Sequence, residues 1–122
     1  MPKKIFIVDD DPSLRDVFKI IFERAGFEVA IESSGSSILN NTHSLPDIYL
    51  LDRQLPGSNG LDICRYIKSN DLTRHIPVLM VTAASDISEM AQEAGADDYI
   101  QKPFSIKDLL QIIKRHLGEP AE

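Results

Sequence analysis

The stretch Ile5-Phe6-Ile7-Val8-Asp9-Asp10-Asp11 decides the fold, because a short apolar run ends abruptly in three carboxylates. A run of this kind, bounded by polar residues, is typical of a strand buried in a parallel sheet. Comparable runs recur along the chain, and stretches with helical spacing separate them. We therefore predict strands at residues 4–8, 27–31, 48–51, 78–81 and 99–101.

Apolar residues at i, i+3 and i+4 spacing mark the helices between these strands. Asp11-Pro12 has the form of an N-cap followed by proline, and Ser105 has the form of a second N-cap. We predict helices at about 12–25, 36–42, 59–69, 87–94 and 106–117. The alternation predicts an α/β fold in which βα units form a five-stranded parallel sheet with five helices. We expect a single domain over residues 1–122, with a core at about 4–117 and a tail at 118–122.

Polar side chains stand at the ends of four of these strands. They are Asp9-Asp10-Asp11, Asp52, Thr82 and Lys102. In an open parallel sheet, ligands bind beyond the carboxyl ends of the strands, so we expect these groups to converge on one edge. The alternative is that the three aspartates form a solvated loop with a helix cap and have no chemical role. Asp11 is in any case better explained as that cap than as a metal ligand.

Such a set of groups suits phosphoryl transfer. Asp9 and Asp10 offer the oxygen ligands that Mg²⁺ prefers, and a bound cation relieves the repulsion between carboxylates. Asp52 could act as a nucleophile that forms an aspartyl phosphate. Lys102 would neutralise charge, and Thr82 could donate its hydroxyl to a phosphoryl oxygen.

Composition narrows the possible functions. The net charge of -6 argues against sequence-independent binding of DNA or RNA, which needs a basic surface. Cys64 is the only cysteine, which excludes an intrachain disulfide, and we expect it to be a small core residue. No apolar stretch approaches the ~20 residues of a membrane span, and no signal-peptide pattern opens the chain, so we expect a cytoplasmic location. We interpret His43, His75 and His116 as surface residues, because they lack metal-ligand spacing.

These motifs resemble those of the receiver domain of bacterial two-component response regulators, over about residues 4–117. They are Val8-Asp9-Asp10-Asp11, Leu51-Asp52-Arg53-Gln54-Leu55-Pro56-Gly57, Val81-Thr82-Ala83 and Lys102-Pro103-Phe104. The resemblance implies a doubly wound, flavodoxin-like fold, a five-stranded parallel sheet of strand order 2-1-3-4-5 flanked by five helices. It also implies a phosphorylation-dependent signalling switch rather than an enzyme, with catalysis limited to its own Mg²⁺-dependent phosphorylation and slow dephosphorylation.

The resemblance also assigns roles to individual residues. Asp52 would accept a phosphoryl group from a sensor histidine kinase or a phosphotransfer protein. Mg²⁺ would be held by Asp9, Asp10, Asp52 and the backbone carbonyl of Gln54. Thr82 and Lys102 would contact the phosphoryl group, Tyr99 would match the switch aromatic, and the Lys102–Pro103 bond would be cis. Phosphorylation would shift a two-state equilibrium in the surface around the fourth helix, fifth strand and fifth helix.

Two other functions stay open. A receiver-like scaffold could work without phosphorylation, although the complete set of acceptor residues argues against it. An aspartate-nucleophile phosphatase places a second aspartate two residues after its nucleophile, whereas Gln54 stands two after Asp52. The pair Asp9 and Asp11 does meet that spacing. Arg53 is a less usual bulky cation beside the acceptor, and gating of access to the site is one role open to it.

Opposite charges on the expected output surface raise the question of a homodimer. The fifth helix carries Lys107, Lys114 and Arg115, and the fourth helix and its flank carry Asp86, Glu89, Glu93, Asp97 and Asp98. These charges could pair across a two-fold axis formed by the fourth helix, fifth strand and fifth helix. A solvated surface is the alternative and is slightly favoured, because exposed ion pairs contribute only about 0–1 kcal/mol each.

Overall fold

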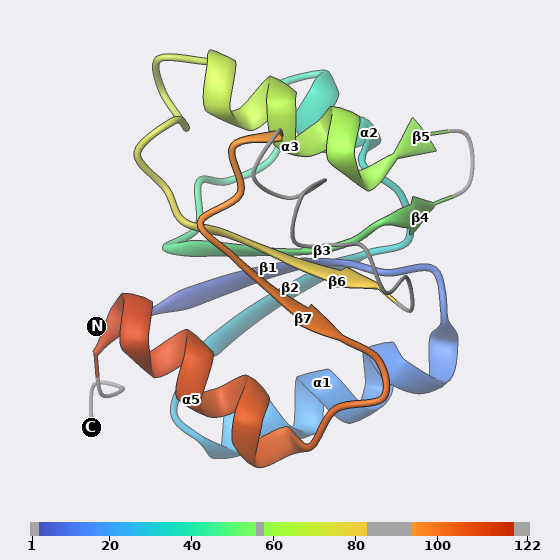
Figure 1. Ribbon diagram of the computed structural model, residues 1–122, viewed down its shortest axis with the longest axis vertical. Coiled ribbons are helices and arrows are strands. Elements are labelled where there is room, and N and C mark those ends of the chain that lie inside the picture. Colours follow the sequence, from blue (N-terminus) through green and yellow to red (C-terminus); the bar gives the residue numbers. More distant parts are fainter. Residues whose placement is uncertain (1–2, 56–57, 83–93, 119–122) are drawn as a thin grey trace.

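A central parallel sheet lies between two layers of helices in the computed structural model, which describes residues 3–55, 58–82 and 94–118 (Figure 1). Helices α2 and α3 lie on one side of the sheet, and α1 and α5 lie on the other (Figure 1). The five strands are β1 Lys4–Val8, β2 Glu28–Glu32, β3 Ile48–Asp52, β6 Val78–Thr82 and β7 Asp98–Gln101. Their order, β2-β1-β3-β6-β7, confirms the predicted order 2-1-3-4-5.

Capping groups fix the ends of the helices. The helices are α1 Pro12–Arg24, α2 Ser36–Leu39, α3 Gly60–Ser69 and α5 Ile106–Leu117. As predicted, Asp11 caps α1, accepting a hydrogen bond from the Ser13 amide at 3.0 Å. Ser105 caps α5 in the same way, accepting from the Asp108 amide at 3.0 Å. The predicted helix at 87–94 lies, apart from Ala94, outside the described residues.

The structure corrects several details of the predicted elements, among them single-residue shifts at the ends of strands. Strand β2 begins one residue late, because the amide of Phe27 still donates to the carbonyl of Phe22 at the end of α1. Helix α2 ends at Leu39 rather than 42, and Asn41 follows in a left-handed conformation with φ 58°. The loop expected at 53–58 contains a small antiparallel hairpin, β4 Gln54–Leu55 with β5 Ser58–Asn59.

Apolar side chains fill both faces of the sheet, which explains the unbroken apolar runs. Phe6 and Val8 point into the cluster on the side of α3, whereas Ile5 and Ile7 belong to the cluster on the side of α1 and α5. Burial of each such side chain contributes about 1.5–3 kcal/mol. Cys64 is fully buried in the first cluster, which confirms its expected place in the core.

His43 is not the surface residue that we expected. It is half-buried, and its ring packs edge-on against Phe6 with the centroids 5.3 Å apart. Its Nε2 shares a hydrogen bond with the hydroxyl of the buried Tyr49. His116 is also half-buried, 3.2 Å from Asp98, whereas His75 is exposed as predicted. The loop before β3 brings His43 against Phe6 and Tyr49. This packing between distant segments could not be inferred from an isolated histidine in the sequence.

Burial lowers the pKa of His43, against the opposing effects of the Ser37 backbone and Glu32. The folded protein therefore binds a proton at His43 less readily than the unfolded chain does. The stability that neutral His43 confers is present above pH ~6.5 and is lost as the pH falls from there toward the folded-state pKa.

We expect the free energy of unfolding to fall more steeply between pH 7 and pH 5 in the wild type than in His43→Phe. A single group can contribute at most ~1.4 kcal/mol per pH unit to this slope. Urea unfolding at a series of pH values measures it. His75→Phe, at an exposed histidine, is the matched control and should keep the wild-type slope. Equal slopes in all three proteins would contradict the role assigned to His43.

Candidate functional site

Three carboxylates meet where β1 and β3 end. Asp9 and Asp10 follow β1 directly, and Asp52 is the last residue of β3. Because the parallel register sets Val8 beside Leu51, the two strands end at the same level. One carboxylate oxygen from each of the three residues lies within 4.8 Å of the others. Asp9 is only 2% exposed and Asp52 only 8%, whereas Asp10 is exposed, so two of the three carboxylates are largely removed from water.

Lys102 brings the opposite charge to this edge. Its Nζ lies 3.6 Å from Oδ2 of Asp52 and 3.8 Å from Oδ2 of Asp9. The Lys102 amide donates to the carbonyl of Thr82 at 2.7 Å, which joins the ends of β6 and β7. Thr82 is buried at the end of β6, one residue beyond the partner of Asp52 in the register. The peptide bond between Lys102 and Pro103 is cis.

The electrostatics of Asp9 favour a bound cation. Burial raises the pKa of Asp9, and the charges of Asp52 and Asp10 raise it further. A hydrogen bond from the Asp11 amide to Asp9 Oδ1, at 2.9 Å, and the charge of Lys102 act in the opposite direction. The net increase means that the ionised form of Asp9 lacks compensation. A hard divalent cation would supply it, because carboxylate oxygens are its preferred ligands.

Two other predicted residues lie farther along the same elements. Gln54 opens the hairpin two residues after Asp52 and pairs with Asn59. Tyr99 is the second residue of β7, beside Met80 in the register, with 40% of its surface exposed. The structure thus gathers Asp9, Asp10, Asp52 and Lys102, whereas Tyr99 stands three residues before the lysine.

Helix α3 rests directly on the backbone of Asp52, a contact that sequence reasoning missed. The Gly60 amide donates to the Arg53 carbonyl at 2.8 Å, and the Asn59 side chain caps the helix through the Leu61 amide. A Cβ atom at Gly60 would lie 2.1 Å from the Asp52 carbonyl oxygen and 2.9 Å from Cα of Arg53. The sequence signal for this contact is the glycine itself. Glycine weakens a helix, so its presence at the first position of α3 indicates that a side chain does not fit there.

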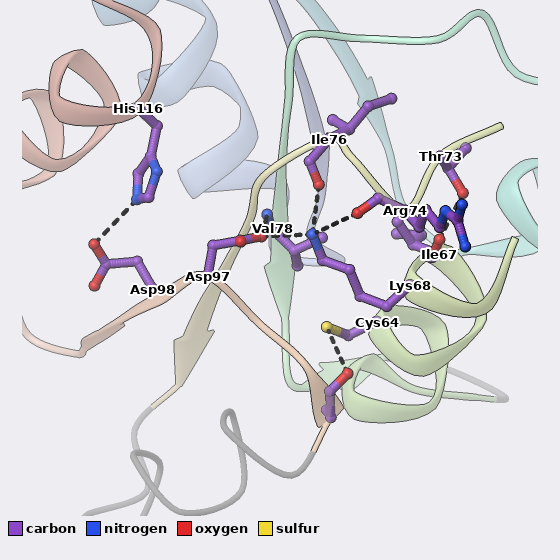
Figure 2. Close-up of polar contacts among 11 residues, drawn as sticks. Cys64, Ile67, Lys68, Thr73, Arg74, Ile76, Val78, Asp97, Asp98 and His116 are labelled. Carbon is purple, nitrogen blue, oxygen red and sulfur yellow. Dashed lines mark hydrogen bonds and ion pairs between the residues drawn. The ribbon is translucent and has the colours of Figure 1, made fainter. Parts of the chain in front are cut away.

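A second polar cluster, which was not predicted from the sequence, lies at the other end of the strands, where β6 and β7 begin. Figure 2 shows Nζ of Lys68 directed at Oδ2 of Asp97, 2.6 Å away, and at the carbonyl of Ile76, 2.8 Å away. The same oxygen of Asp97 accepts a hydrogen bond from the Val78 amide at 2.8 Å. Asp98, the next residue, pairs with Arg115 at 3.1 Å and with His116. The first residues of β7 are therefore held from both faces of the sheet.

Comparison with known proteins identifies the architecture and its site together. The model of the response regulator receiver domain family matches residues 5–114. The chain belongs to this family. It is 40% identical to the DNA-binding response regulator MtrA of Mycolicibacterium smegmatis in an alignment that covers the whole chain and 55% of MtrA. The receiver domain therefore spans about half the length of the curated relatives that it matches.

Solved receiver domains have the same fold. The receiver domain of the sensor histidine kinase PA1611 from Pseudomonas aeruginosa superimposes with a TM-score of 0.85 at 26% identity, covering 98% of this chain and all of that one. Its crystal structure is described with a magnesium ion coordinated in the active site cleft. The BeF3-activated DrrB receiver domain gives a TM-score of 0.84 at 33% identity, with the same coverage. DrrB is a Thermotoga maritima homologue of OmpR and PhoB.

We expect Gly60→Ala to lower the free energy of unfolding by about 1–3 kcal/mol, because the new methyl group overlaps the Asp52 carbonyl. The Gly60 amide should exchange its hydrogen faster as its bond to Arg53 lengthens. Native-state hydrogen exchange measures both effects. Gly118→Ala is the control for a loss of stability without a clash, because alanine is strained at φ 77° but its Cβ would meet nothing within 4 Å. In Gly118→Ala, the amide of Gly60 should exchange at the wild-type rate relative to its neighbours. If the amide of residue 60 also exchanged at that rate in Gly60→Ala, the close contact would be refuted.

Proposed function

We propose that this receiver domain is a phosphorylation-dependent switch in which Asp52 accepts the phosphoryl group. The observation that carries the proposal is the position of Asp52, a buried carboxylate with an ammonium 3.6 Å away and two further carboxylates beside it. The domain would catalyse only its own phosphorylation and slow dephosphorylation.

The chemistry follows from the residues around Asp52. An oxygen of Asp52 attacks the phosphorus of a phosphohistidine, and the phosphorus–nitrogen bond breaks with its electron pair left on the imidazole. Attack by an anion on an anionic group requires charge compensation. The ammonium of Lys102 offsets charge on the phosphoryl oxygens, and the hydroxyl of the buried Thr82 donates a hydrogen bond to one of them.

Mg²⁺ fits the donor set, since Asp9 and Asp10 present oxygens next to those of Asp52. We infer that these three carboxylates and the backbone carbonyl of Gln54 hold the ion. When bound, the ion would compensate the negative charge of ionised Asp9 and the charge of the incoming phosphoryl group. The magnesium site described for the PA1611 receiver domain supports this assignment.

The switch would pass from Thr82 to β7. Thr82 lies beside Gln101 in the register, and its carbonyl accepts the Lys102 amide. A displacement of Thr82 toward a phosphoryl group therefore pulls on the end of β7. Tyr99, 40% exposed on the same strand, is the aromatic side chain whose position we expect to change.

The phosphodonor would be a sensor histidine kinase or a phosphotransfer protein. An apolar groove of about 490 Å³ extends from Lys102, between α1 and the start of α5. Its lining comprises Leu14, Val17, Phe18, Lys102, Pro103, Phe104 and Ile106. Because Lys102 lines this groove and its Nζ lies 3.6 Å from Asp52, we assign the groove to the donor.

The competing functions have less support. In the phosphatase hypothesis Asp11 would act with Asp9, but the Asp11 side chain is exposed and caps α1. A scaffold without phosphorylation would not need Lys102 between two buried carboxylates. For the homodimer, Asp97 and Asp98 already pair with Lys68, Arg115 and His116 of their own chain. Those internal pairs favour the solvated surface, and sedimentation of the phosphorylated protein stays the test.

The location and nucleic-acid contacts of the chain are also inferred. In the part of the chain that the structure describes, no helix is long and apolar enough to cross a membrane. We place the domain in the cytoplasm, where its single cysteine would stay reduced. MtrA is named a DNA-binding regulator, but this chain matches only 55% of it and carries a net charge of -6. We infer no direct nucleic-acid contact by this chain.

Acetyl phosphate should label Asp52 in the presence of Mg²⁺ or Mn²⁺, since the site offers a nucleophile and charge compensation. Intact mass spectrometry should show the addition of one phosphoryl group, and chelation of the metal should abolish it. Asp52→Asn should remain unlabelled, whereas Asp62→Asn, at an exposed aspartate of α3, should label normally. If Asp52→Asn were labelled to the same extent as the wild type, the assignment of Asp52 as the acceptor would be wrong.

Asp9→Asn should be more stable than the wild type without metal, because it removes a buried carboxylate whose raised pKa reports an uncompensated charge at neutral pH. The expected gain is on the order of 1 kcal/mol. Millimolar Mg²⁺ should raise the melting temperature of the wild type by mass action and leave that of the variant unchanged. Asp11→Asn keeps the helix cap and should respond as the wild type does. Equal responses of Asp9→Asn and the wild type would show that Asp9 is no ligand.

A further inference from the structure

Arg53 is a cation fixed beside the acceptor by its own backbone. Its amide donates to the Val81 carbonyl at 3.0 Å, and its carbonyl accepts the Gly60 amide at 2.8 Å. The chain therefore cannot shift at Arg53 without breaking contact with both β6 and α3. Its Cα is only about 3.8 Å from that of Asp52, as for any two consecutive residues.

Among the residues that the structure describes, none forms an ion pair with Arg53. Within residues 3–55, 58–82 and 94–118, no carboxylate lies at ion-pair distance from its guanidinium, although the side chain is partly buried. Other arginines of the chain do have such partners, at Asp62 for Arg65 and at Asp98 for Arg115. An unmatched guanidinium next to a phosphoryl-transfer site is available for an anion, because its planar fork of N–H donors suits phosphate oxygens.

The phosphorylated site requires one more positive charge than the rest of the site supplies. Three carboxylates and one ammonium leave a negative excess that a divalent cation balances. When Asp52 becomes an acyl phosphate, its own charge is lost and a phosphoryl dianion takes its place. One negative charge is then in excess, and Arg53, the residue that follows Asp52 in the chain, carries a charge of the sign that would balance it.

We propose that Arg53 is a specificity-determining residue of the acceptor site, which attracts dianionic phosphodonors and stabilises the phosphoryl group on Asp52. This rests on the proposed function of Asp52. Through the same charge, Arg53 repels Mg²⁺ from the carboxylates. Its removal therefore has two opposite effects, slower phosphorylation by a dianion and tighter binding of the metal.

Two small phosphodonors distinguish this charge effect from general damage. Acetyl phosphate is a dianion at neutral pH, and phosphoramidate is a monoanion. In both cases an Asp52 oxygen–phosphorus bond forms, and the bond from phosphorus to the leaving group breaks with its electron pair, to acetate or to ammonia. Labelling rates of the wild type, Arg53→Gln and Arg53→Lys are followed by intact mass at saturating Mg²⁺, and Mg²⁺ affinity is measured without donor by calorimetry.

We expect Arg53→Gln to slow labelling by acetyl phosphate about three- to tenfold, and labelling by phosphoramidate less than about twofold. Its Mg²⁺ affinity should rise by about two- to fivefold. Arg53→Lys keeps the charge but not the planar fork, and should lie closer to the wild type than Arg53→Gln does in all three measurements. Arg24→Gln, which removes an exposed arginine at the far end of α1, should also match the wild type.

An equal loss with both donors, or an unchanged or weaker Mg²⁺ affinity, would overturn the proposal, because damage to the fold weakens every function together. If Arg53→Gln does not fold, Arg53→Met replaces it with the same expectations. Failure of the Asp52 assignment has a different signature: neither donor labels the wild type, whereas the Mg²⁺ measurement still reports whether the Arg53 charge reaches the carboxylates.

Discussion

Two carboxylates held side by side out of water are the constraint on which the site depends. Asp9 and Asp52 meet because β1 and β3 are neighbours in the sheet and their register ends both strands at one level. A buried charge without a partner costs several kcal/mol, so the fold tolerates the pair only with compensation. Lys102 and the Asp11 amide supply part of it. The raised pKa of Asp9 indicates that the compensation is incomplete, and a bound cation would complete it.

Asp52, the proposed acceptor, is also confined from the side of α3. Gly60 lies against the carbonyl of Asp52, and Arg53 is hydrogen-bonded to β6 on one side and to α3 on the other. Asp52 therefore has little freedom in its backbone, and the groups around it were set in place by folding. A rigid acceptor is an advantage for phosphoryl transfer, in which correct positioning carries much of the rate.

The strand ends and helix caps could be predicted from the sequence because each depends on local chemistry. An apolar run followed by Asp9 or Asp52 indicates a buried strand with a polar end, and Asp11-Pro12 indicates a capped helix whatever surrounds it. The hairpin at Gln54–Asn59 could not be predicted, since two short pairs of residues carry no periodic signal. The Lys68 cluster, the burial of His43 and the contact at Gly60 arise from tertiary packing, which brings distant segments together without a pattern in any one of them.

The anchoring of β7 has a mechanical consequence. Asp97 and Asp98 tie the start of this edge strand to α3 on one face and to α5 on the other (Figure 2). Its far end is tied to Thr82, beside the acceptor. If the proposed switch pulls on β7 at Thr82, the ties at its start would let the strand turn about its first residues more easily than slide along β6. Lys102 would then be displaced farthest, while Tyr99, one residue after Asp98, would mainly rotate. A small displacement in the buried site would thereby become a change of side-chain orientation on the exposed surface.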